Sequence, residues 1–107
     1  MAQSPPSSPR LDLQNILTEI LGTDQVYFQP PPTVSMEYPC IVYKRDYQLT
    51  RFADDKPYAH RKRYQVTVID RNPDSDIPDK VAELPLCIFD WFFTSENLNH
   101  DVFKLFF

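Results

Sequence analysis

The chain has 107 residues, a formal net charge of −4 and a sequence pI near 5.0. This length predicts one domain with a single core, and the acidic balance argues against general nucleic-acid binding, which requires a surplus of basic side chains. The sequence has no secretory leader pattern and no apolar run near the roughly 20 residues of a membrane span, so we expect cytoplasmic folding without membrane contact.

A polar arm followed by an amphipathic helix is predicted at the start of the chain. Residues 1–9, MAQSPPSSP, are too polar and proline-rich to form a core, which predicts a flexible arm ahead of a single domain over residues 10–107. Apolar side chains then recur at helical spacing: Leu13, Ile16, Leu17, Ile20 and Leu21. Gly22 follows them and is a typical helix stop, so we expect a helix over residues 10–21.

Three stretches in the middle of the chain are typical of strands. Residues 25–28 form a short candidate, and residues 38–47 are nearly continuously apolar at their centre, which favours a strand inside a sheet with both faces covered. Residues 62–70 alternate in polarity, which predicts a central strand. One face of that strand is expected to be buried and to carry Tyr64, Val66 and Val68.

A turn at residues 71–74 is expected to lead into a second helix. Pro73 cannot donate to a strand ladder, and Ser75 or Asp74 can cap the helix that follows. Apolar residues then occur at helical spacing: Ile77, Val81, Leu84 and Ile88. Because a proline breaks a helix, Pro85 predicts that this one ends or bends near Leu84.

The C-terminal segment predicts a hairpin of two aromatic-rich strands around the polar residues 95–99. Both faces of each strand carry aromatic side chains, so either helices or another subunit must cover them. The whole pattern predicts an α+β fold. We expect a mixed or mostly antiparallel sheet of about four to five strands, with an N-terminal helix and a second helix packed on it.

The segment 48–60, QLTRFADDKPYAH, has no periodicity and is expected to be a long functional loop between two paired strands, with a plain surface loop as the alternative. The residues expected to make contacts with partners are Arg51, Phe52, Asp54, Asp55, Lys56 and Tyr58 in this loop and Arg61 and Arg63 at its base. The basic run 61–63, followed by an aromatic, is also a hint of nucleic-acid binding, although a solvated strand start is favoured.

The sequence contains no catalytic motif, phosphate-binding loop or metal-ligand spacing, so we expect no enzymatic activity, cofactor or metal. His60 and His100 lie outside any motif, which favours structural or surface roles. The aspartates between residues 70 and 79 do not match a calcium loop and are better explained by turns and caps. Cys40 and Cys87 are expected to be buried free thiols, with a single disulfide as the alternative.

Three phrases resemble a family of small proteins from long-tailed bacteriophages, known as minor capsid, tail-completion or tail-terminator proteins. They are YPCIVYKRD at 38–46, TRFADDKPYAHRKRYQVTVIDRNPDSDIPDK at 50–80 and ENLNHDVFKLFF at 96–107. The resemblance covers about 25–107 and does not include the arm.

The resemblance implies a non-enzymatic structural protein of the virion neck, made in the host bacterial cytoplasm. It would assemble as a homo-hexameric ring that caps the tail tube, meets a head-completion or stopper protein, and lets DNA pass through its lumen. Trp91 and Phe93 join the expected ring interface. Another neck protein, a small nucleic-acid-binding module and a host adaptor domain remain as alternatives.

Overall fold

A computed structural model describes residues 9–53 and 56–107, and for 49–53 and 56–60 it describes the backbone path. Within these residues the fold is α+β, as predicted, with a mixed five-stranded sheet in the order β1-β2-β3-β5-β4. The strands are β1 (Val26–Phe28), β2 (Cys40–Ala53), β3 (Lys56–Asp70), β4 (Cys87–Ser95) and β5 (Leu98–Phe106). The helices are α1 (Pro9–Leu21) and α2 (Ile77–Ala82).

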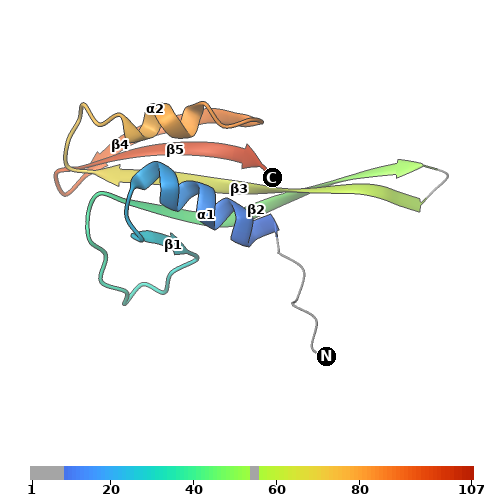
Figure 1. Cartoon of the computed structure of the whole chain (residues 1–107), viewed down its shortest axis with the longest axis horizontal. Coiled ribbons are helices and arrows are strands. Elements are labelled where there is room, and N and C mark those ends of the chain that lie inside the picture. Colours follow the sequence, from blue (N-terminus) through green and yellow to red (C-terminus); the bar gives the residue numbers. More distant parts are fainter. Residues whose placement is uncertain (1–8, 54–55) are drawn as a thin grey trace.

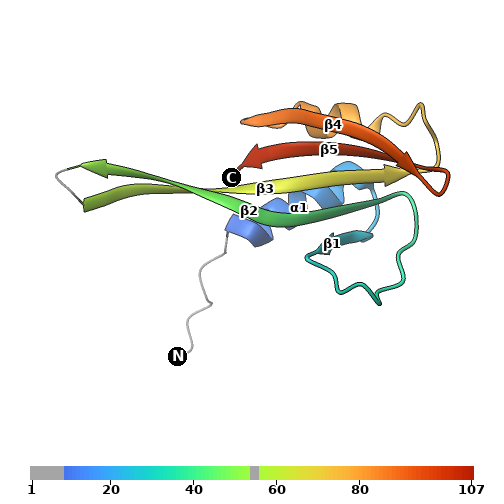
Figure 2. The same cartoon turned by 180° about the vertical axis from the view of Figure 1, so that it is seen from behind.

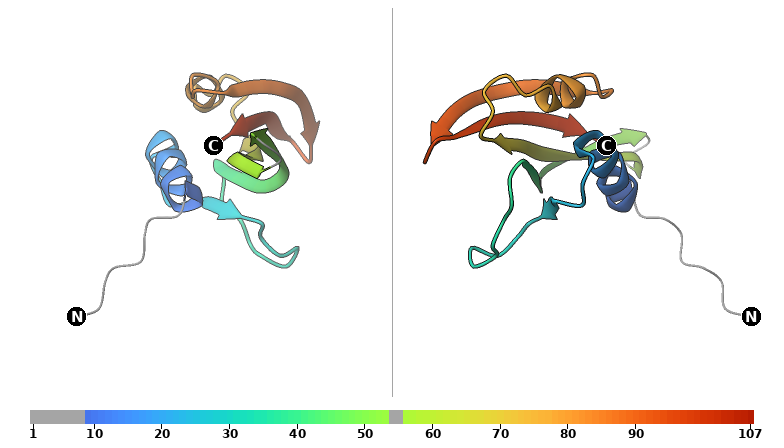
Figure 3. Two further views of the ribbon diagram at one scale, coloured as in Figure 1. Left: turned by 90° about the vertical axis from the view of Figure 1, so that its right-hand side faces the viewer. Right: turned by 60° about the vertical axis from the view of Figure 1, so that its left-hand side comes forward.

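Both helices lie on one face of the sheet, α1 over β1 and β2 and α2 beside β4 and β5 (Figures 1 and 2). We call this side the helix face; Tyr64, Val66 and Val68 of β3 point toward it and are buried, as predicted. The opposite side, which carries Gln65, Thr67 and Lys104, is called the open face. The sheet is curved when seen end on (Figure 3). The two helices form one layer on the helix face, and no helix of the described residues lies on the open face.

The predicted first helix is confirmed, beginning one residue earlier at Pro9. Leu13, Leu17 and Leu21 are buried in the core that the sheet shares with α2. Gly22 ends the helix with a φ of 83°, and its N–H donates to the Thr18 carbonyl at 2.9 Å. The periodic leucines and the glycine stop thus encode α1 locally.

The turn after β3 is held by side chains, as its Asn and Asp residues predict. Asp70 Oδ1 accepts a hydrogen bond from the Asn72 N–H at 2.9 Å, and Asn72 Oδ1 accepts one from the Asp74 N–H at 3.0 Å. Asn99, next to the β4–β5 turn, donates to the Asp70 carbonyl at 3.0 Å. These contacts tie the two turns together at one end of the sheet.

The second helix is shorter than predicted. Its N-cap position is Asp76, whose side chain makes no capping bond, and the Ser75 hydroxyl accepts a hydrogen bond from the Ile77 N–H at 3.3 Å. The helix ends before Pro85, as that proline predicts, and Ile88, which continued the helical spacing, lies in β4.

The predicted loop 48–60 is wrong for the residues that the structure describes. β2 and β3 stay paired through Gln48↔Lys62, Thr50↔His60 and Ala53↔Lys56, so the segment is a long hairpin that projects beyond the body of the sheet (Figure 1). The segment lacks the alternating polarity from which strands are predicted, so its strands are defined by the pairing of β2 with β3 and not by a local pattern.

Candidate interaction surface

β4 is an edge strand that exposes large apolar side chains on both faces of the sheet. Register with β5 places Phe89 and Phe92 on the helix face and Ile88 and Trp91 on the open face. Their exposed fractions are 52% and 49% for the first pair and 68% and 54% for the second. We call these four residues the β4 edge. Neither helix covers these four side chains, so cover by helices, one of the two predicted alternatives, does not occur at this strand.

A row of stacked rings extends the β4 edge over the open face. The ring of Phe93 is half-buried, 4.7 Å from the ring centroid of Trp91 and 4.3 Å from that of His100. The Phe93 and His100 rings are nearly parallel, with 13° between their planes. Trp91 and Phe93, both predicted at an interface, are therefore brought together, and His100 stacks on Phe93 as an aromatic partner.

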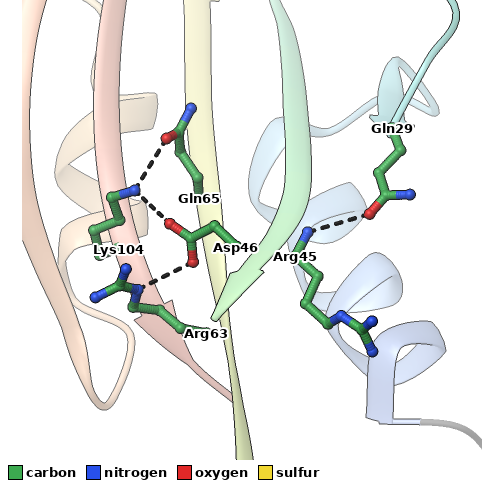
Figure 4. A network of polar contacts seen from close by, with 6 residues as sticks. All are labelled: Gln29, Arg45, Asp46, Arg63, Gln65 and Lys104. Atoms are coloured by element: carbon green, nitrogen blue, oxygen red, sulfur yellow. Dashed lines mark hydrogen bonds and ion pairs between the residues drawn. The ribbon is translucent and has the colours of Figure 1, made fainter. Parts of the chain in front are cut away.

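A charged cluster occupies the centre of the open face (Figure 4). Asp46 accepts hydrogen bonds from Arg63 Nε at 3.0 Å and from Lys104 Nζ, and Lys104 also donates to Gln65 Oε1 at 3.0 Å. The Asp46 side chain is 15% exposed. Burial raises its pKa, but the hydrogen bonds and charges of Lys104 and Arg63 outweigh burial and hold the pKa below its ordinary value.

The local cause of this cluster is a β-bulge. The register between β2 and β3 shifts between Arg45 and Tyr47, so Asp46 is the extra residue and turns toward Lys104. Tyr47 then shares the side of Arg63, whose guanidinium carbon lies 4.9 Å from the Tyr47 ring centroid. Arg63, predicted as a contact residue, is thus already engaged within its own chain.

The other predicted contact residues lie in the projecting hairpin. Arg51 and Phe52 belong to β2 and Lys56 and Tyr58 to β3, as backbone positions only, and Asp54 and Asp55 lie outside the described residues. The structure thus places the hairpin end away from the β4 edge (Figure 2).

The basic run 61–63 does not form one patch. Because successive strand side chains point to opposite faces, Arg63 joins Asp46 on the open face while Lys62 points to the helix face. Arg61 lines an apolar hollow of about 350 Å³ with Leu13, Leu84 and Phe106 among others. Lys62 instead lines a second hollow with Arg10 and Arg45, a grouping of distant residues that the sequence analysis missed.

The described residues carry little chemistry of other kinds. Within 9–53 and 56–107, no three His, Cys, Asp or Glu side chains are grouped so that they could hold a metal ion. No helix in that part of the chain is long and apolar enough to cross a membrane. Cys40 and Cys87 are free, as favoured above; Cys40 is buried, but Cys87 is only half-buried.

Comparison with known protein families gives no match, and comparison with curated proteins gives none either. The functional assignment therefore rests on the β4 edge, the open face and the three sequence phrases described above.

Proposed function

We propose that this protein is a structural component of the virion neck of a long-tailed bacteriophage, without enzymatic activity. In this role it assembles as a homo-hexameric ring that caps the tail tube and joins it to the head. The observation that carries the proposal is the β4 edge, an edge strand with apolar side chains exposed on both faces. The resemblance at 38–46, 50–80 and 96–107 supplies the class of assembly.

The β4 edge is unusual for the surface of a free monomer. Single exposed apolar residues are common, but two large ones on each face of a nine-residue edge strand are typical of an interface. Interface cores are enriched in Trp and Phe, which account for three of these four residues. The helices cannot cover the strand from both sides, because they occupy one face of the sheet (Figure 1). A second polypeptide is therefore the natural cover.

The arrangement of the two prominent features favours head-to-tail contact. The strand order places β2 and the edge strand β4 on opposite sides of β3 and β5, and the hairpin projects from the end of the molecule. Contact between the hairpin of one copy and the β4 edge of the next would join different surfaces. Such contacts close into rings when the rotation between copies allows it. The remaining surfaces would meet the tail tube protein and the head-completion protein, with DNA passing through the lumen.

Oligomeric state, measured by light scattering with and without the tail tube protein, tests the proposal. Replacing Ile88, 68% exposed on β4, by Lys should reduce assembly strongly without unfolding the chain, because the charge would be buried in the contact. Val34→Lys is the matched control, since Val34 is an exposed aliphatic residue outside the sheet. A wild-type chain that stays monomeric at every concentration, also with tube protein, would contradict ring assembly.

A shortened hairpin tests the second contact. The pairing Gln48↔Lys62 allows residues 49–61 to be replaced by an Asn-Gly turn that closes β2 on β3. The core residues that the structure describes lie outside the removed segment, so the variant should fold but fail to join heads to tails. Infectious particles assembled from this variant would exclude the hairpin from the joining contact.

A further inference from the structure

Three basic side chains from distant parts of the chain line one hollow of about 330 Å³ on the side of α1. Arg10 comes from the first turn of α1, Arg45 from β2 and Lys62 from β3. The rest of the lining is Phe28, Gln29 and Tyr64, so no carboxylate takes part. Among the described residues, none of these cations forms an ion pair. The chain as a whole has a net charge of −4, whereas this pocket is locally positive.

The lining groups are positioned by contacts within the fold. Arg10 Nη1 donates to the Tyr43 hydroxyl at 3.3 Å, and its guanidinium carbon lies 4.6 Å from the centroid of the Phe28 ring. Gln29 has a left-handed backbone with a φ of 45°, and its Oε1 accepts a hydrogen bond from the Arg45 N–H at 3.4 Å (Figure 4). Gln29 also lines the hollow, so its side chain adds a polar group to the lining.

We propose that this basic pocket binds a phosphate group. Guanidinium groups match phosphate oxygens with two parallel donors, and a lysine adds a compact positive charge. Three cations exceed what one carboxylate would balance, whereas a phosphate can carry two negative charges. The Arg10 guanidinium already covers one face of the Phe28 ring, which makes that ring a poor stacking platform for a base. The lining therefore favours an anion over a base.

The phosphate can belong to a free ion or small metabolite or to the backbone of a nucleic acid, and the chemistry of recognition is the same. This inference does not rest on ring assembly, because one chain carries the whole pocket. A monomer that binds phosphate would support the pocket and not ring assembly. A ring that does not bind phosphate would support ring assembly and not the pocket.

Calorimetry with inorganic phosphate and fluorescence anisotropy with a single-stranded oligonucleotide test the pocket on the full chain. Arg45→Gln should weaken binding at least about tenfold, because a charge-assisted contact is lost. The matched control is Lys44→Gln: Lys44 is the preceding residue of β2, equally charged and exposed, but on the opposite face. It should change affinity by less than about fivefold.

The outcomes separate the sources of the phosphate. Arg45-dependent binding of inorganic phosphate supports the pocket as a site for a free phosphate group. Arg45-dependent binding of the oligonucleotide alone supports it as a backbone site. In either case the side-chain amide resonance of Gln29 should shift in NMR spectra on titration. No binding of either probe by the wild-type chain, or equal losses in the Arg45→Gln and Lys44→Gln variants, would overturn the proposal.

Discussion

Asp46 of β2 and Lys104 of β5 lie 58 positions apart in the sequence and form an ion pair on the open face. Replacing Asp46 by Asn should lower the free energy of unfolding by about 1–3 kcal/mol, because Lys104 and Arg63 would lose their partly buried counter-charge. Urea denaturation measures this change. Asp76→Asn is the control: its ion pair with Lys80 is exposed, so its effect should stay near or below about 0.5 kcal/mol.

The Asp46 contribution should depend on pH in a defined direction. The folded pKa of Asp46 lies below its ordinary value of 3.8, so the carboxylate stabilises the fold fully above that value. The contribution is lost as pH falls through the folded pKa. The difference in stability between wild type and Asp46→Asn should therefore be constant at neutral pH and shrink below about pH 4. A difference that grows on acidification would contradict this pairing.

Asp101 should behave in the opposite way. Burial and the negative charge of Asp79 raise the pKa of Asp101 above its ordinary 3.8, and His100 opposes them. The ionised carboxylate therefore costs stability at neutral pH, and this cost disappears as pH falls below the unfolded pKa. Asp101→Asn should raise the melting temperature at pH 7 and lose its advantage near pH 3. Lower stability of this variant at pH 7 would show that Asp101 makes a favourable contact.

The two thiols should differ in reactivity. Cys40 is fully buried, and burial, with a smaller effect of Asp70, raises its pKa to about 11. At pH 8 only about one Cys40 in a thousand would be a thiolate, whereas Cys87 is half-buried and more accessible. A disulfide-exchange reagent should therefore label the Cys40→Ser variant in the native state. It should label Cys87→Ser only in denaturant, and fast labelling of that variant would place Cys40 at the surface.

Gly22 should be required at the end of α1 for its left-handed backbone conformation and not for its small size. Its φ of 83° disfavours other residues, while a Cβ there would meet nothing within 4 Å. Gly22→Ala should lower the free energy of unfolding by about 1 kcal/mol, and Gly22→Asn by less, since Asn tolerates this conformation. Chemical denaturation of both variants checks the order. Equal stability of Ala and Gly at this position would mean that α1 can end in another way.

The local elements of the fold could be predicted from the sequence because each is encoded by neighbouring residues. The leucines of α1, Gly22 and the alternation in β3 give helical or strand periods directly. The turn at Asn72 follows from side chains that bond their own backbone. Helical spacing continued to Ile88 by chance, but Pro85 correctly predicted that α2 ends before that residue.

The candidate sites were less predictable because they depend on register. The sequence indicated Trp91 and Phe93 through their density of aromatics, but it treated Lys62 and Arg63 as one basic cluster. Strand alternation sends these neighbours to opposite faces, and the pocket gathers Arg10 and Arg45 from other elements. Residues 61–63 directly precede the alternating part of β3, and this position indicates that their side chains point to opposite faces.

The register shift between Phe89 and Trp91 leaves Asp90 as an extra, exposed residue in the middle of the β4 edge. A flat apolar edge strand is a template for pairing with strands of other chains and so a site of aggregation. The bulge interrupts the even spacing of backbone donors and acceptors, and a flat strand added across it would remove the Asp90 carboxylate from water without a partner. Asp90 therefore restricts which chains can pair with β4. A binding strand must follow the bend at the bulge, and it must either place a cation against Asp90 or leave this side chain in water.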